Sequence, residues 1–244
     1  MANWSDPRSD IAGFGSASAA RSEAFDAGLR KYMLSVYNYM ASGVLLTGIV
    51  ALLFAQSGLA YQVFAGPGIL KYIVMFAPLA FVMVLSFGIN KLSTFATQAL
   101  YWAYAAVMGV SLSYIFLAYT GTSIAQTFFA TAAAFAGLSL FGYTTKKDLS
   151  GFGTFLIMGV VGLLVASLIN IFLRSSMMDL VISAVGVLLF AGLTAYDTQK
   201  IKSIYAYVAG TEMMGKSVVM GALTLYLDFI NMFLFLLRFM GNRD

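Results

Sequence analysis

Seven long apolar segments constrain this chain more than any other feature of its sequence. They occupy residues 32–54, 70–89, 97–119, 122–143, 152–173, 180–200 and 217–240. A helix of about 20 apolar residues crosses the hydrocarbon core of a bilayer and satisfies its own backbone hydrogen bonds without water. We therefore predict an all-α integral membrane protein, a bundle of seven transmembrane helices.

The composition supports this class and excludes others. Apolar residues make up 61% of the chain and charged residues 10%, whereas a soluble domain carries about 25% charged residues. The net charge of +4 is carried by loops between the segments, so we expect no nucleic-acid partner. The chain has no Cys and no His, which excludes thiolate sites. Any response to physiological pH must therefore come from carboxyl groups.

The first 30 residues differ from the rest. They are polar and rich in small residues, and they lack the apolar core of a signal peptide. This pattern predicts a flexible cytoplasmic tail over residues 1–30, followed by a transmembrane domain over residues 31–244.

The distribution of Lys and Arg predicts the orientation. With the N-terminus in the cytoplasm, ten basic residues lie inside and four lie outside (Lys71, Arg174, Arg238 and Arg243). Such an excess is typical of cytoplasmic loops, so we predict a cytoplasmic N-terminus and an external C-terminus. The alternative is an even number of spans with one re-entrant segment.

An acidic residue, Asp228, lies near the middle of the last apolar segment. A carboxylate near the bilayer centre costs about 2.5–3.5 kcal/mol on insertion scales, so it usually has a function or a partner. A neutral, hydrogen-bonded structural carboxyl is the simpler alternative. Thr224 and Asn231 share its helix face at i−4 and i+3, and Arg238 continues that face to the outer end. We expect this stripe to face the bundle interior.

A second acid, Asp197, lies near the cytoplasmic end of the sixth segment. If that helix continues past Lys202, whose side chain can reach the interface, Asp197 moves deeper and approaches Asp228. Two close carboxyls cannot both ionise cheaply, so the pair would share a proton and titrate as a unit. Asn170 and Tyr196 are candidates for further polar contacts.

The two carboxyls and nearby amide oxygens suit a hard cation such as Ca²⁺. Two acids are too few for a tight site, so we expect transient Ca²⁺ coordination by Asp197 and Asp228 along a path. Ca²⁺ would then be a transported ion, and no resident cofactor is expected.

Small residues recur at four-residue spacing, a pattern that lets membrane helices approach closely. They are Ala105, Gly109 and Ser113; Ala133 and Gly137; Gly162 and Ala166. We interpret them as packing positions.

Three motifs resemble the Bax inhibitor-1 (transmembrane Bax inhibitor motif) family, in particular its bacterial YccA-like branch. They are KKDLSG at 146–151, GLTAYDTQKIK at 192–202 and LYLDFINMF at 225–233. The likeness extends from about residue 32 to residue 238. It implies a bacterial inner-membrane protein whose last helix lies at the centre, surrounded by the other six.

The resemblance also implies that Asp197 and Asp228 form the family's di-aspartyl pH sensor, which controls a Ca²⁺ leak. In that scheme, a basic residue at the cytoplasmic end of the second helix pairs with the sixth-helix aspartate and latches the closed state. Lys91 stands at this position, where the family's bacterial structural representative has an arginine. Because Lys lacks the bidentate fork of Arg, a weaker latch is expected.

Two other functions compete with a leak. Members of the bacterial branch act as substrates and modulators of the membrane-anchored AAA protease FtsH, and the 1–30 tail would suit such a partner as a handle. Two intramembrane aspartates also occur in aspartyl proteases. The pattern Gly-x-Gly-Asp of those enzymes is replaced here by LYLD at 225–228, and the bulky side chains would obstruct a substrate backbone. We therefore expect no enzymatic activity.

Overall fold

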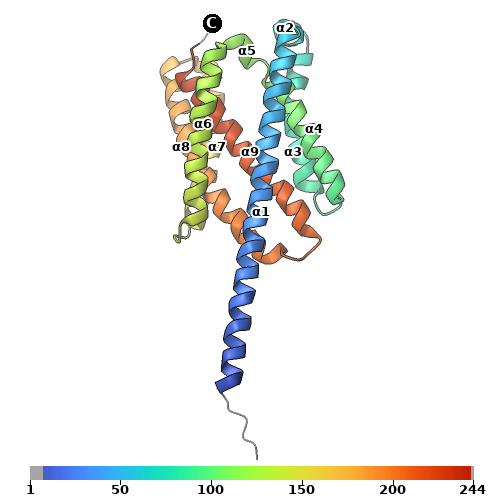
Figure 1. The fold of residues 1–244 in the computed structure, drawn as a ribbon. Helices are drawn as coiled ribbons and strands as arrows, with labels where there is room; N and C mark the ends of the chain where they lie inside the picture. The colour runs from blue at the N-terminus through green and yellow to red at the C-terminus, as the bar shows by residue number, and fades with distance from the viewer. Residues whose placement is uncertain (1–7, 243–244) are drawn as a thin grey trace, which may run out of the picture.

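The computed structural model describes the backbone of residues 8–242 and the side chains of residues 22–242. Within this part of the chain all regular structure is helical (Figure 1). The helices are α1 (Arg8–Gln56), α2 (Leu59–Ala65), α3 (Leu70–Gly88), α4 (Thr94–Leu112), α5 (Ile115–Ala118), α6 (Gly121–Thr144), α7 (Ser150–Leu173), α8 (Ser176–Val208) and α9 (Met213–Met240).

Seven of the helical stretches in the described residues are long and apolar enough to cross a membrane. They are the Ser22–Gln56 part of α1, then α3, α4 with α5, α6, α7, α8 and α9. The predicted all-α, seven-span architecture is confirmed. α9 runs through the bundle as one continuous helix, and it ends opposite the end at which α1 enters (Figure 1). A re-entrant last segment is therefore not observed.

α1 begins much earlier than the sequence predicted. Its backbone is helical from Arg8, where a flexible tail over residues 1–30 was expected; residues 1–7 lie outside the described part. The physical reason is the lack of a helix breaker, because no proline occurs between Pro7 and Pro67. Alanine and other good helix formers are frequent in this stretch.

α8 also exceeds its predicted end at residue 200, continuing to Val208. The Lys202 amine donates a hydrogen bond to the Tyr143 carbonyl at 2.8 Å, so the charge is satisfied at the end of α6. The helix ends before Gly210, whose φ of 73° lies in the left-handed region that glycine adopts readily. Asp197 is consequently placed inside a continuous helix.

α9 is the most enclosed span. It buries 67% of its apolar window, against at most 44% for any other span, and it packs against α1, α4, α6 and α8. The Tyr226 hydroxyl lies 2.7 Å from Thr47 Oγ1, which in turn donates to the Ala105 carbonyl. These bonds join α9, α1 and α4. That the other six helices surround α9 stays a prediction.

The small residues do not all serve packing. At Gly109 an added Cβ would lie 2.7 Å from the Thr47 carbonyl oxygen, so α4 and α1 approach closely there. Gly137 and Gly162 face open space, and the packing interpretation is wrong for these two positions. A close approach that the sequence did not predict occurs at Gly142, whose Cβ would collide with the Ala195 backbone of α8.

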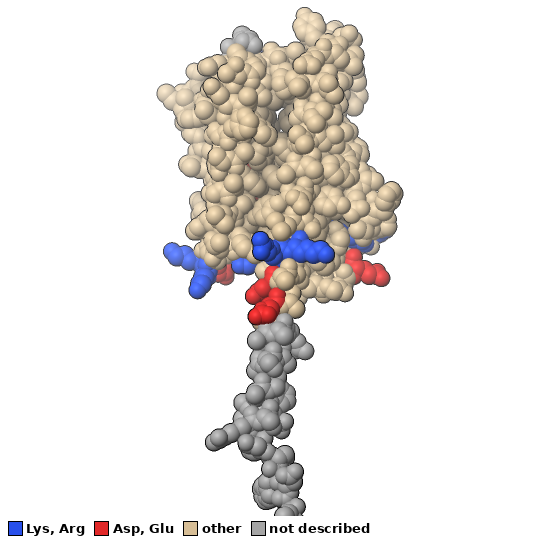
Figure 2. All heavy atoms as spheres, in the orientation of Figure 1, with Lys and Arg blue, Asp and Glu red and all other residues tan. Residues whose placement is uncertain are grey.

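Charged side chains gather at one end of the bundle, as Figure 2 shows for the visible face. We call this the basic end; its residues are Arg30, Lys31, Lys91, Lys146, Lys147, Lys200, Lys202 and Lys216. Lys71, Arg174 and Arg238 belong to the opposite end. This separation follows the positive-inside pattern from which the orientation was predicted.

Candidate functional site

Asp197 of α8 and Asp228 of α9 lie together inside the bundle. Their side chains are 9% and 4% exposed, and their carboxyl groups interact with each other. Asp228 Oδ2 is buried without a hydrogen-bond partner. Along α9, Asp228 lies about 18 Å from Lys216 and about 15 Å from Arg238, at 1.5 Å per residue. The pair is therefore far from both ends of the last helix.

A cavity of about 150 Å³ adjoins Asp197 between α1, α8 and α9. Its polar lining residues are Tyr32, Asp197, Lys200, Ser217 and Thr224. At about 30 Å³ per molecule in the liquid, it has room for roughly five waters. The Tyr32 hydroxyl and Ser217 Oγ lie 2.8 Å apart on its wall. The cavity thus combines these polar groups with apolar walls, and it lies between Asp197 and the basic end.

Lys200 is the cation that interacts with Asp197. It follows Asp197 by three residues on α8, a spacing that places two side chains on one helix face. Its side chain is exposed, and its amine lies 5.8 Å from the centre of the Tyr196 ring. Lys200 therefore supplies positive charge where the cavity meets the basic end.

The predicted supporting residues divide into those near the aspartates and those held elsewhere. Thr224 shares the cavity with Asp197, while its hydroxyl donates to the Met220 carbonyl at 3.0 Å. The Asn231 amide donates to the Leu227 carbonyl of its own helix at 2.8 Å. Tyr196 packs against α7 at Gly153. Of these three, only Thr224 lines the cavity beside Asp197.

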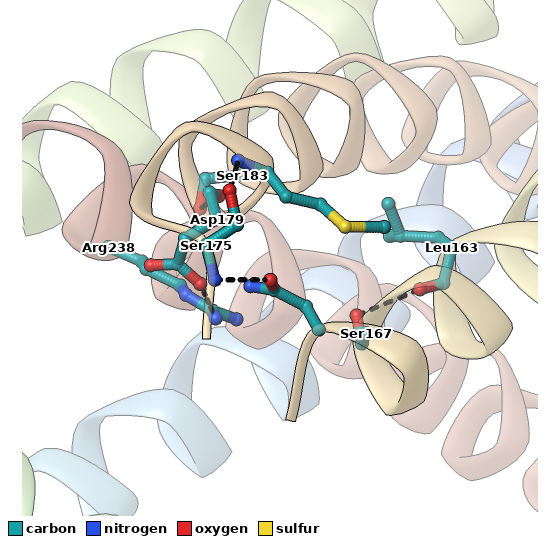
Figure 3. Close-up of polar contacts among 8 residues, drawn as sticks. Leu163, Ser167, Ser175, Asp179, Ser183 and Arg238 are labelled. Carbon is teal, nitrogen blue, oxygen red and sulfur yellow. Dashed lines mark hydrogen bonds and ion pairs between the residues drawn. The ribbon is translucent and has the colours of Figure 1, made fainter. Parts of the chain in front are cut away.

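Asn170 and Arg238 belong to the opposite end of the bundle. Asn170 Oδ1 accepts a hydrogen bond from the Ser175 amide at 3.1 Å, in the turn between α7 and α8. Arg238, in the last turn of α9, forms an ion pair with Asp179 in the first turn of α8 (Figure 3). Both residues fasten helix ends, and neither reaches the aspartate pair.

The predicted latch residue, Lys91, is exposed and makes no ion pair within the described residues. Another lysine holds the end of α3 instead, and it comes from α9: Lys216 Nζ donates to the Ile89 carbonyl at 3.2 Å. This bond ties the start of α9 to the end of α3. Sequence reasoning missed Lys216, although it is the first charged residue before the last apolar segment.

A hydroxyl pair next to Asp197 was also missed. Ser139 Oγ of α6 and Thr198 Oγ1 of α8 lie 3.2 Å apart in a buried position. Thr198 directly follows Asp197 in the motif at 192–202, which was the only signal for its place. The pair fixes α6 against α8 beside the candidate site.

The site offers few ligands for a metal ion. No three side chains of the His, Cys, Asp or Glu types come together in the part of the chain that the structure describes. A resident Ca²⁺ site normally uses six to eight oxygen ligands. Two carboxyl groups with a small cavity beside Asp197 suit a passing ion or a proton better than a resident metal ion.

Comparisons with known proteins find close relatives along nearly the whole chain. The sequence model of the family described as "Inhibitor of apoptosis-promoting Bax1" matches residues 29–244. The Inner membrane protein YbhL of Escherichia coli K12 is 47% identical over 219 residues, which cover 89% of this chain and 94% of the relative. A protein of Rickettsia prowazekii is 48% identical over 225 residues, covering 92% and 94%. A membrane protein of Streptococcus pyogenes serotype M3 is 38% identical over 228 residues, covering 90% and 96%.

Proposed function

This chain belongs to the Bax inhibitor-1 family, and we propose that it is a pH-sensitive Ca²⁺ leak of the bacterial inner membrane, gated by Asp197 and Asp228. The observation that carries the proposal is the placement of two buried, mutually interacting carboxyl groups next to a cavity that Asp197 lines. An intramembrane carboxyl pair of this kind is costly, and such groups commonly mark ion or proton pathways.

Protonation sets the state of the gate. With one proton shared, the pair carries a single charge, and with two it is neutral, so the bundle stays closed. With both carboxyls ionised, the two negative charges repel each other; two unit charges at about 4 Å repel by about 4 kcal/mol at an effective dielectric constant of about 20. Separation of α8 from α9 relieves this repulsion by admitting water. Flux is therefore expected to rise with pH.

The groups that face the pair shape this response. Lys200 on α8 offsets part of the negative charge of Asp197, and the Tyr32 phenol of α1 lines the same cavity. Carboxylate oxygens attract Ca²⁺, and the small number of ligands lets the ion leave again. Such weak binding suits conduction.

Ca²⁺ flux into liposomes that contain the purified protein, followed from mildly acidic to mildly alkaline pH, tests the proposal. We expect wild-type flux to rise with pH and Asp228→Asn to flatten that rise, because the amide cannot ionise. Asp197→Asn should act in the same direction. Asp148→Asn makes the same chemical change at an exposed residue in the α6–α7 loop and should keep the wild-type profile. Equal profiles for wild type and both buried variants would refute gating by the two aspartates, and the absence of flux from all of them would refute the leak.

A second function is favoured by α1, which extends beyond the other helices at the basic end (Figure 1). We propose that this extension is a handle for a membrane-anchored AAA protease of the FtsH type. Deletion of residues 2–21 should then slow the turnover of the protein in cells, while flux in liposomes persists. Unchanged turnover would contradict this function without affecting the leak.

A further inference from the structure

A groove of about 840 Å³ lies between α1 and α6, with Phe229 of α9 in its lining. Figure 2 shows the same face hollowed between these two helices. Its walls are apolar side chains, several of them exposed to the surroundings of the bundle, such as Leu34, Leu45 and Leu140. It is separate from the cavity beside Asp197, with which it shares no lining residue.

The groove has the length and depth of a lipid chain site. On α1 it extends from Arg30 to Leu45 and on α6 from Phe128 to Tyr143, which is about 22 Å along each helix. Half of a hydrocarbon core is about 15 Å thick, so the groove covers the full depth of one leaflet. It therefore opens to lipid along one whole leaflet.

Its two ends differ in chemistry. At the basic end the lining includes Arg30 and Tyr143, while the deep end contains Val44, Leu45 and Phe128. Arg30 is exposed and makes no ion pair within the described residues. Tyrosine at such a depth is typical of the membrane interface. Just outside the groove, the Lys202 amine lies 4.9 Å from the centre of the Tyr143 ring.

From this arrangement we propose that the groove binds one anionic phospholipid of the leaflet at the basic end. An acyl chain lies along the apolar walls toward Phe229. The phosphate pairs with Arg30, whose guanidinium can hold it in a bidentate manner. An unpaired cation above an apolar groove is complementary to an anionic lipid and not to a zwitterionic one.

Native mass spectrometry of the full-length protein, with phosphatidylglycerol or phosphatidylcholine added, tests the headgroup preference. We expect one phosphatidylglycerol to be retained more strongly than phosphatidylcholine. Arg30→Gln should reduce that preference about fivefold, the weight of one basic residue near anionic lipid. Lys31→Gln is the matched control, because Lys31 is exposed and does not line the groove. Equal retention of both lipids, or equal effects of both variants, would overturn the proposal.

Photo-crosslinking with a phosphatidylglycerol that carries a diazirine on one acyl chain tests the location. We expect crosslinks to concentrate on residues 33–45 and 128–143. Ala136→Trp should suppress them, because it fills the groove, whereas Ala134→Trp should not, because that residue is exposed on α6 outside the groove. Crosslinks spread evenly over all spans would overturn the proposal. Crosslinked dimers joined through α1 and α6 would also overturn it, in favour of a second copy as the occupant.

Discussion

At the scale of single residues, Asp228 is the position where the sequence was most informative. A carboxyl in the middle of an apolar segment signals a site without any knowledge of the fold. Its partner was harder to predict, because the depth of Asp197 depends on how far α8 continues. The continued helix makes a tertiary contact there, the bond between Lys202 and the Tyr143 carbonyl, which joins residues 59 positions apart. Local sequence does not contain such information.

Two buried tyrosines, Tyr226 and Tyr104, are expected to differ in their response to loss of the hydroxyl. Tyr226→Phe removes the bond to Thr47 and should lower the free energy of unfolding by about 0.6 kcal/mol, the average for such bonds in membranes. Tyr104→Phe removes a buried hydroxyl that has no partner and should cause no loss. Thermal unfolding in detergent micelles measures both. A larger loss for Tyr104→Phe would contradict these assignments.

Asp148, in the loop before α7, gives a prediction about acid. Hydrogen bonds from the Ser150 hydroxyl and amide lower the pKa of Asp148 below its ordinary value of 3.8. A lowered pKa means that the charged form stabilises the fold above pH 3.8, and that this contribution is lost as pH falls through the folded-state pKa. We expect Asp148→Asn to lower stability slightly near neutral pH, where the charged form contributes, and to remove this small acid dependence. Thermal unfolding of the wild type and of Asp148→Asn, measured from neutral to acidic pH, tests this expectation.

At the scale of helices, the sequence predicted where apolar spans lie and misjudged how far helices continue beyond them. Hydrophobicity indicates only the part of a helix that lies inside the bilayer. It therefore did not predict the polar extensions of α1 and α8. The short helix α2 was missed for a related reason. At seven residues it is too short to show a span pattern.

The contact between α6 and α8 gives a prediction for two glycines of one helix. Gly142→Ala places a methyl group against the Ala195 backbone, and such overpacking typically costs about 1–3 kcal/mol. Gly137→Ala meets open space, so the better helix propensity of alanine should leave stability equal or slightly higher. Thermal unfolding midpoints of the wild type and both variants, measured in the same detergent, test this difference. Equal losses would show that α6 and α8 are not in tight contact at Gly142.

At the scale of the whole molecule, seven spans place the two ends of the chain on opposite sides of the membrane. This count was predictable because each span carries its own signal. The arrangement of the spans in the bundle could not be predicted in the same way, because the contacts of α9 with α1, α4, α6 and α8 join distant parts of the chain. Charge bias then predicts which side faces the cytoplasm.

The orientation can be measured directly because the chain contains no cysteine. Ser57 is exposed in the turn after α1, at the end opposite the basic end. Ser203 is exposed near the C-terminal end of α8, at the basic end. Each can be replaced by cysteine, as Ser57→Cys and Ser203→Cys. In intact spheroplasts a membrane-impermeant maleimide should label only Ser57→Cys. Ser203→Cys should react after lysis. The reverse pattern would contradict the predicted cytoplasmic N-terminus.

The ion pair between Arg238 and Asp179 has a mechanical consequence. It fastens α8 to α9 at one end, and the ring of Phe235 against Gly186 reinforces that end. The two helices can then rotate relative to each other about this fastened end, which serves as a fixed pivot. Asp228 lies 10 residues from the pivot and Met213 lies 25 residues from it. An opening of about 1 Å at Asp228 would therefore become about 2.5 Å at Met213, since rise is proportional to residue number. A displacement that begins at the aspartates is thus largest at the basic end, where α9 begins.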